Sequence, residues 1–177
     1  MSRIGFRHCD SRYPFLWATA LQPAARWHRF GEGPAHYFAD TPVGAWAEFL
    51  RHEDIRDPAD LDGIRRSLWA VELPDRGYVT PALPDKQLTG GLASYAACQS
   101  EAARLRTTGA RRIEAPSAAL SAGGARGWIA NPDEKPAPAA RDGVVWVLYG
   151  TGRDLIGWPA AEATAPPARA LPLVRHF

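Results

Sequence analysis

The chain is poor in cysteine and has no long hydrophobic run. Its two cysteines, Cys9 and Cys98, are far apart and have no partner at CxxC or CxxH spacing. A structural zinc site is therefore not expected, and two reduced thiols are the simpler interpretation. No apolar run reaches 18 residues, so no membrane-spanning helix is predicted. The first 15 residues lack an apolar stretch followed by small residues, which makes the cytoplasm the expected location.

Several motifs with a known chemistry are also absent. The chain has no GxGxxG or GxxxxGK[ST] loop to hold phosphates, no HExxH pair for a metal and no GxSxG around a nucleophilic serine. The net charge is only +2 over 177 residues, which is too small to indicate binding to nucleic acid. Hydrophobic residues make up 46% and charged residues 23%, as in ordinary globular proteins. The length predicts one domain over residues 1–177.

The pattern of apolar residues predicts mixed strands and helices. Strands are expected at 34–39, 68–73, 112–115 and 144–149, and helices at 42–50 and 92–103. Thr41 and Pro42 are expected to cap and open the first helix, and Gly109 to follow the end of the second. There is no regular alternation of strand and helix, so we expect an α+β fold with a mixed sheet and flanking helices.

Three segments carry no clear periodic signal. Residues 1–26 are expected to be irregular, since Pro14 and Pro23 interrupt the pattern. Residues 131–143 are rich in Pro, Ala and charge and are expected to form a mobile loop. Residues 159–170 are rich in Ala and Pro and give little reason to pack.

One group of residues suits a nucleotide. Arg26, Tyr37 and Glu48 follow one another at intervals of 11 positions, on an expected loop, strand and helix. An arginine fork suits a phosphate, a tyrosine face suits a flat ring and a carboxylate suits a developing cation. The alternative is a solvated arginine, a core tyrosine and a surface glutamate, and spacing alone favours that alternative.

A second candidate is Ser117, which follows an expected strand and Pro116. A serine at this place could sit rigidly at the edge of a pocket. By itself, however, a role in a turn or as a helix cap is the better interpretation of Ser117.

Taken together, these segments resemble the RES domain family. The family has a Gly-Arg-Trp/Phe-Asn loop, a tyrosine strand, a helix with Ala-x-x-Glu, and a later Pro-Ser-Ala segment. This chain has 25–28 (Ala-Arg-Trp-His), Tyr37, 45–48 (Ala-Trp-Ala-Glu) and 116–118 (Pro-Ser-Ala), in that order. It departs from the family at Ala25 and His28. Arg29 offers a second register for the arginine, and Arg26 is preferred because Trp27 follows it.

The resemblance implies a fold related to ADP-ribosyltransferases and NAD⁺ as the substrate, with no further cofactor and no metal. It implies that Glu48 stabilises the ribosyl cation, that Arg26 binds a phosphate and that Ser117 binds the ribose or carboxamide. Tyr37 would pack on nicotinamide, and Trp27, His28 and Arg29 would complete the substrate site.

Three functions follow from the resemblance. The first is an NAD⁺ glycohydrolase or phosphorylase that acts as the toxin of a toxin–antitoxin pair. The second is a protein ADP-ribosyltransferase that uses the same residues. The third is an inactive interaction module, if His28 has disrupted the pocket. Expected partners are NAD⁺ and an antitoxin with an Xre-like helix-turn-helix domain, with no membrane or direct nucleic-acid binding. A homo-oligomer is left open.

Overall fold

The computed structural model describes residues 2–16, 21–127 and 139–177. Its strands are β1 (Arg3–Asp10), β2 (Ala35–Ala39), β3 (Arg66–Leu73), β4 (Arg112–Pro116), β5 (Val144–Tyr149) and β6 (Ile156–Thr164). Its helices are α1 (Pro42–His52), α2 (Asp85–Leu88) and α3 (Tyr95–Thr107), with 3₁₀ turns η1 (Pro58–Leu61), η2 (Leu92–Ser94) and η3 (Ala168–Leu173). Within the described ranges, no helix is long and apolar enough to cross a membrane.

The strands form one six-stranded sheet in the order β4-β5-β2-β1-β3-β6. The expected α+β class is confirmed, but the expected mixed sheet is wrong: the pairs between these strands are all antiparallel. Strands β2 and β3, which are joined through α1, run in the same direction. They are not neighbours, because β1 lies between them and pairs antiparallel with both.

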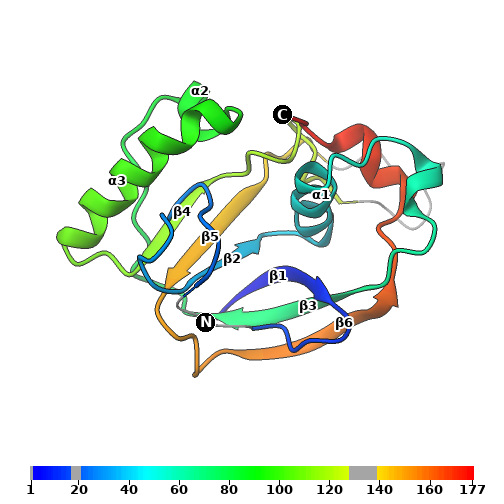
Figure 1. Ribbon diagram of the computed structural model, residues 1–177, viewed down its shortest axis with the longest axis horizontal. Helices are drawn as coiled ribbons and strands as arrows, with labels where there is room; N and C mark the ends of the chain where they lie inside the picture. Colours follow the sequence, from blue (N-terminus) through cyan, green and yellow to red (C-terminus); the bar gives the residue numbers. More distant parts are fainter. Residues whose placement is uncertain (1, 17–20, 128–138) are drawn as a thin grey trace.

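The sheet is nearly divided between β1 and β2. These two strands pair only at Phe6 and Ala39, whereas β1 pairs with β3 along its whole length, from Arg3↔Leu73 to Asp10↔Arg66. We call β4, β5 and β2 the β2 half, and β1, β3 and β6 the β1 half. Figure 1 shows the two halves diverging below α1.

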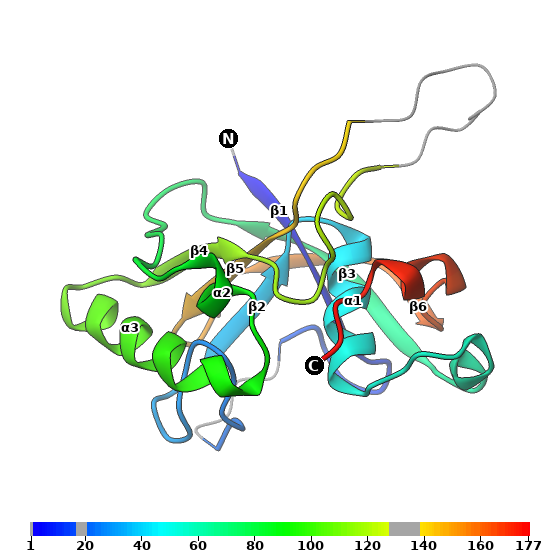
Figure 2. The ribbon, with the colours of Figure 1, turned by 90° about the horizontal axis from the view of Figure 1, so that it is seen from above.

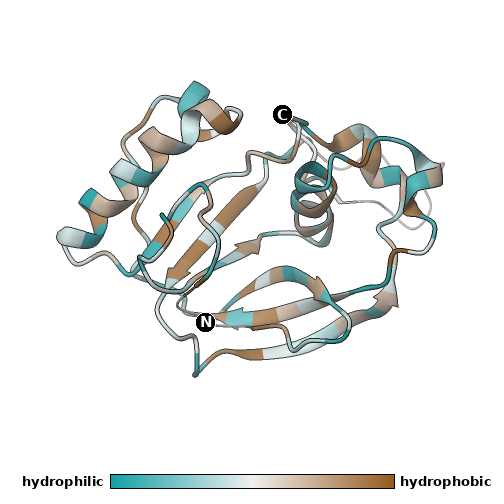
Figure 3. Cartoon of the chain, viewed as in Figure 1, coloured by the Kyte–Doolittle hydropathy of each residue, from teal (hydrophilic) through white to brown (hydrophobic). Residues whose placement is uncertain are grey.

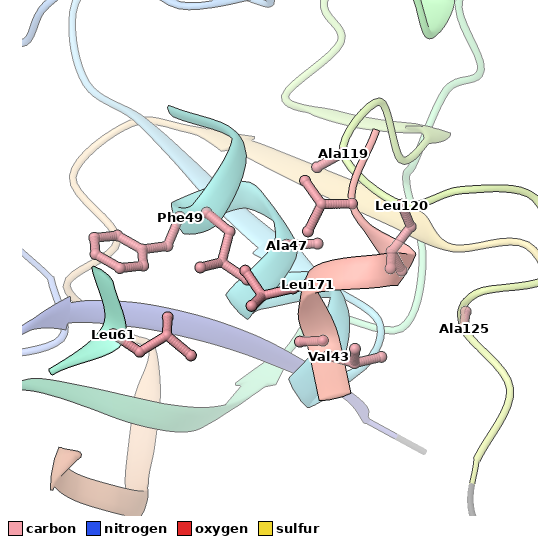
Figure 4. Packing of buried hydrophobic residues seen from close by; sticks show 11 residues of the cluster. Val43, Ala47, Phe49, Leu61, Ala119, Leu120, Ala125 and Leu171 are labelled. Carbon is pink, nitrogen blue, oxygen red and sulfur yellow. The ribbon is translucent and has the colours of Figure 1, made fainter. Parts of the chain in front are cut away.

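Helix α1 covers the junction of the two halves. Thr41 Oγ1 accepts a hydrogen bond from Gly44 N at 3.1 Å and Pro42 opens the helix, so the expected cap is confirmed. The helix buries one face in a cluster with η3, and Figure 4 shows Val43 and Ala47 beside Leu171. This packing fixes α1 at the point where the sheet divides.

Helix α3 covers the β2 half and lies to the left of α1 in Figure 2. Cys98, Ala102 and Leu105 pack with Ile113 and Val147 of β4 and β5. Figure 3 shows the hydrophobic colouring concentrated on β5. Gly109 has φ +91° just after the helix, a conformation that glycine adopts without strain, which agrees with the expected stop.

Two expectations about irregular segments are wrong. Residues 3–10 form β1, although their sequence is too polar to show a strand pattern, because neighbours on both sides supply hydrogen-bond partners. Residues 156–164 form the edge strand β6, where Pro159 is tolerated, and Ala170 and Leu171 are buried against α1.

The expected mobile loop at 131–143 lies partly outside the described residues, which resume at 139. Arg141 pairs with Gly124 in an isolated bridge and forms an ion pair with Asp40. The end of that segment is thus attached to the strand–helix junction before α1.

Candidate active site

A cavity of about 430 Å³ opens where the two halves of the sheet diverge. Its volume falls in the range of small-molecule sites. Its wall is formed by β1, β2, α1, the loop that precedes β2 and the start of α3. The charged and titratable side chains on this wall include Arg7, His8, Arg26, Glu48, Arg51 and Arg66. Four arginines therefore stand with two carboxylates, Glu48 on α1 and Asp10 at the end of β1, and Asp10 is already bound by Arg12.

Glu48 lies on the side of α1 that faces the cavity, and 28% of its side chain is exposed. Ser117 Oγ donates to its Oε1 at 3.4 Å, and His52 Nε2 lies 3.9 Å from its Oε2. Burial raises the pKa of Glu48, while the charges of His52 and Arg51 oppose the increase. The carboxylate is thus reachable from the cavity but incompletely hydrated.

Ser117 follows β4 and is buried. Its Oγ accepts hydrogen bonds from the N–H groups of Ala119 at 3.3 Å and Leu120 at 3.2 Å. The same hydroxyl donates to Glu48, although 69 positions separate the two residues. Both interpretations of Ser117 therefore describe the same side chain: it caps a turn and it contacts the carboxylate.

Arg26 lines the cavity, but its guanidinium already has protein partners. Its Nη1 donates to Gln87 O at 3.1 Å and Ser94 Oγ at 2.8 Å, and its Nη2 donates to Gly90 O at 2.5 Å. The guanidinium also lies 4.7 Å from the centre of the Tyr95 ring. Arg26 thus joins the loop before β2 to the segment between α2 and α3.

Arg29 lies at the surface. It is 47% exposed, binds Ser100 Oγ at 2.9 Å and pairs with Glu32 at 3.5 Å. It does not line the cavity. Of the two arginine registers that the sequence allows, only Arg26 reaches the candidate site.

Tyr37, Trp27 and His28 form one hydrogen-bonded group. Tyr37 Oη accepts from Trp27 N at 3.0 Å and lies 2.9 Å from His28 Nδ1. His28 Nε2 lies 2.8 Å from Pro23 O, which can only accept, so Nε2 carries the proton and Tyr37 donates to Nδ1. Burial lowers the pKa of His28 and raises that of Tyr37.

The ring of Tyr37 therefore lines the cavity, while its hydroxyl is bonded within this group. Trp27 is 2% exposed and belongs to the core under α3, with part of it at the cavity wall. His28 is 1% exposed and does not line the cavity. The histidine at the family's asparagine position therefore braces the loop without entering the pocket.

The sequence reasoning missed Arg51 and Arg7. Arg51 is 2% exposed and donates to Ala118 O and, at 2.9 Å, to Gly90 O, so it holds the walls together. Arg7, on β1, lines the cavity and its Nε has no hydrogen-bond partner in the part of the chain that the structure describes. Burial lowers the pKa of Arg7. No sequence signal marked Arg7, because its segment was expected to be irregular.

The described ranges contain no group of three or more His, Cys, Asp or Glu side chains placed to hold a metal ion. The arrangement instead offers four guanidinium groups and two carboxylates, Glu48 and Asp10, around a partly apolar cavity. Such a set suits an anionic molecule with a centre that becomes positive.

Comparison with known proteins adds a family and a fold. The family model described as RES domain matches residues 2–148. The crystal structure of the M. tuberculosis MbcT–MbcA toxin–antitoxin complex contains a similar chain, with a TM-score of 0.59, 14% sequence identity, and coverage of 98% of this chain and 89% of that one. No curated protein matches the chain in sequence. At 14% identity the structural likeness establishes the fold alone.

Proposed function

Because the chain belongs to the RES domain family, we propose that it cleaves the N-glycosidic bond between nicotinamide and ribose in NAD⁺. The observation that carries this proposal is the position of Glu48 in an arginine-lined cavity, where the buried Ser117 behind the wall contacts its carboxylate. Three segments distant in the sequence contribute to that cavity: β1, α1 and the turn after β4.

The reaction needs little from the protein besides charge placement. The C1′–N1 bond breaks and its electron pair leaves with nicotinamide, which departs as a neutral ring and needs no general acid. The ribose becomes an oxocarbenium-like cation, which the Glu48 carboxylate stabilises and towards which it orients water. Water adds to C1′ and loses a proton to Glu48 or solvent. The products are nicotinamide, ADP-ribose and a proton.

The remaining residues divide into contacts with substrate and supports. Arg7 lines the cavity, where its guanidinium has one long hydrogen bond among the described residues, to Tyr37 O at 3.5 Å, and it binds a phosphate of NAD⁺. Tyr37 presents its ring to nicotinamide. Arg26 and Arg51 hold the wall, since their guanidinium groups already donate to main-chain oxygens, and Gly90 O accepts from both.

Three acceptors fit this chemistry. Water gives a glycohydrolase, phosphate gives a phosphorylase and a protein side chain gives an ADP-ribosyltransferase, with Glu48 in the same role. An inactive module is the weakest of the alternatives, because His28 lies outside the cavity and both of its ring nitrogens have partners.

We further propose that the protein is the toxin of a toxin–antitoxin pair. The supporting observation is the fold shared with a chain of the MbcT–MbcA toxin–antitoxin complex. The expected antitoxin carries an Xre-like helix-turn-helix domain and is encoded beside the toxin. Expression of this chain alone should stop growth and deplete NAD⁺, and coexpression of the neighbouring gene should restore both.

The direct test is a product assay on purified protein. NAD⁺ is incubated in phosphate-free buffer, in phosphate buffer and with lysate protein, each with and without a chelator, and products are separated by chromatography. We expect nicotinamide in every arm, while the second product identifies the acceptor. Intact NAD⁺ in all arms, with a folded protein, would refute the proposal. Activity lost to the chelator and restored by zinc would refute the metal-free chemistry.

A further inference from the structure

His8 lies on β1 beside Arg7 and lines the cavity. Its ring stacks on Trp46, with centroids 6.3 Å apart, and meets Phe49 edge-on at 5.2 Å. These two residues flank Glu48 on α1. The histidine therefore borders the turn of the helix that carries the carboxylate, which is the part of the cavity where the reaction is proposed to occur.

The hydrogen bonds of His8 determine where its proton lies. Arg66 Nε donates to His8 Nδ1 at 3.0 Å. An arginine nitrogen can only donate, so Nδ1 must hold a lone pair and the single ring proton is on Nε2. No described residue accepts a hydrogen bond from Nε2. The ring thus offers one N–H donor that the described residues do not use.

Two features of the fold place Arg66 beside His8. Its strand, β3, pairs with β1 so that Leu68, two residues after Arg66, is the Cα partner of His8. Its guanidinium also lies 4.7 Å from the centre of the Phe49 ring. The aromatic contact restricts the guanidinium, and the guanidinium in turn restricts the tautomer of the imidazole. A histidine without such a neighbour would exchange between its two neutral tautomers.

We propose that His8 is a substrate-contacting residue whose Nε2–H donates to an oxygen of the nicotinamide riboside part of NAD⁺, and that Arg66 is the positioning residue that fixes this donor. The inference rests on the proposed function and adds a specificity contact to it. The ligand group is a neutral oxygen, a ribose hydroxyl or the carboxamide carbonyl, because a single N–H without charge suits such an acceptor.

The charges around His8 keep it neutral. Burial, followed by the positive charges of Arg66, Arg7 and His52, lowers its pKa well below the ordinary value of 6.5. These groups face it from β3, β1 and α1, while Glu48 stands on the same turn of α1 as its aromatic neighbours. The donor should therefore persist unchanged over the physiological pH range.

The first test reads the tautomer directly. Nitrogen chemical shifts of the ¹⁵N-labelled histidine rings, without NAD⁺, should identify His8 as the Nε2–H form between pH 6 and pH 8. In Arg66→Met the same ring should show exchange between tautomers or a raised pKa. Arg65→Met is the matched control: the neighbouring arginine is exposed, lies outside the cavity and donates to Ile64 O, so the His8 signals should not change. An Nδ1–H ring in the unaltered protein would overturn the proposal.

The second test measures binding without turnover, in a Glu48→Gln background by calorimetry. His8→Phe keeps the stacking on Trp46 and removes the donor, so the Kd for NAD⁺ should rise about 10-fold. His8→Gln restores an N–H near the Nε2 position and should recover part of the affinity. Thermal melting checks that each variant is folded.

The outcomes separate the two proposals. Equal affinities for His8→Phe and its parent overturn the role of His8 and leave the proposed function standing. Absence of NAD⁺ binding to the folded Glu48→Gln parent overturns both the proposed function and the contact from His8, whatever the tautomer. A raised Kd in His8→Phe with partial recovery in His8→Gln supports both.

Discussion

Both walls of the cavity carry arginines, but the arginines of the two walls differ in their hydrogen-bond partners. On the wall next to α3, Arg26 directs its donors into main-chain and hydroxyl oxygens of the protein. On the β1 wall, Arg7 donates only to Tyr37 O among the described residues, at 3.5 Å, and Arg66 orients His8. One wall is therefore braced by its arginine, and on the other wall the described residues leave the Nε2–H of His8 without an acceptor. We therefore expect the motif residue Arg26 to support the wall and Arg7 to contact the substrate.

The largest effect is expected at Glu48, where the two walls meet. Glu48→Gln keeps the size of the side chain and removes the charge that we propose stabilises the ribosyl cation. Turnover should fall by about 10²-fold or more with little change in NAD⁺ affinity, because the lost interaction belongs to the transition state. Steady-state kinetics with Glu53→Gln, an exposed glutamate just after α1, as the control measures this. A folded Glu48→Gln variant with unaltered turnover would show that the site is misassigned.

The comparison between the walls predicts opposite phenotypes for two arginines. Arg26→Met removes the charged donor to Ser94 Oγ and one of the two donors to each of Gln87 O and Gly90 O, and should lower stability by about 2–3 kcal/mol. Arg7→Met should raise the KM for NAD⁺ about 10-fold, through loss of a phosphate contact, with the melting temperature kept. Denaturant unfolding and kinetics on the same preparations measure both. If Arg7→Met unfolds the protein and Arg26→Met only weakens binding, the roles of the walls are reversed.

The raised pKa of Glu48 gives a pH dependence with a definite sign. The pKa of this carboxyl is higher in the folded protein than in the unfolded chain, so folding favours its protonated form. The protonated carboxyl therefore adds to the stability of the fold at acidic pH. This contribution is lost as the pH rises through the pKa of the folded state. At neutral pH the ionised group therefore costs stability. Glu48→Gln should melt at or above the temperature of the unaltered protein at pH 7, and the difference should shrink towards acidic pH.

The same shift acts on activity in the other direction. Turnover needs the ionised carboxylate, so it should decline as the pH falls, beginning above the ordinary pKa of a glutamate. Melting curves and kcat profiles between pH 5 and pH 8 test both statements. The stability of Glu48→Gln minus that of the unaltered protein should be larger at pH 7 than at pH 5. A smaller difference at pH 7 would contradict this account of the site.

The smallest effect is expected at Arg29, the other arginine of the motif. It is 47% exposed, pairs with Glu32 at the surface and lies outside the cavity. Arg29→Ala should change stability by less than about 0.5 kcal/mol and leave the KM unaltered. Comparison with Arg26→Met tests the register of the motif. A large rise in KM for Arg29→Ala would place the substrate on the outer face of that loop.

Local patterns predicted the elements that local chemistry controls. The Thr41–Pro42 start of α1 needs only a hydroxyl acceptor and a preset φ, and it was found where the sequence places it. The apolar run at 144–149 was found as β5. In contrast, β1 has a charged and polar sequence and owes its conformation to pairing with β3, which no local window contains.

The sequence by itself determined which residues are available to the site and in what order: Arg26, Tyr37, Glu48 and Ser117 all follow from short motifs. Only the tertiary structure decided which partners each of them has. Because the sheet divides between β1 and β2, a cavity forms where Arg7 and His8 stand opposite the motif residues. Because Gly90 O and its neighbours accept from Arg26, that guanidinium braces a wall. The hydrogen-bond partners of a side chain depend on how segments distant in the sequence pack together. The spacing of residues along the chain does not predict that packing.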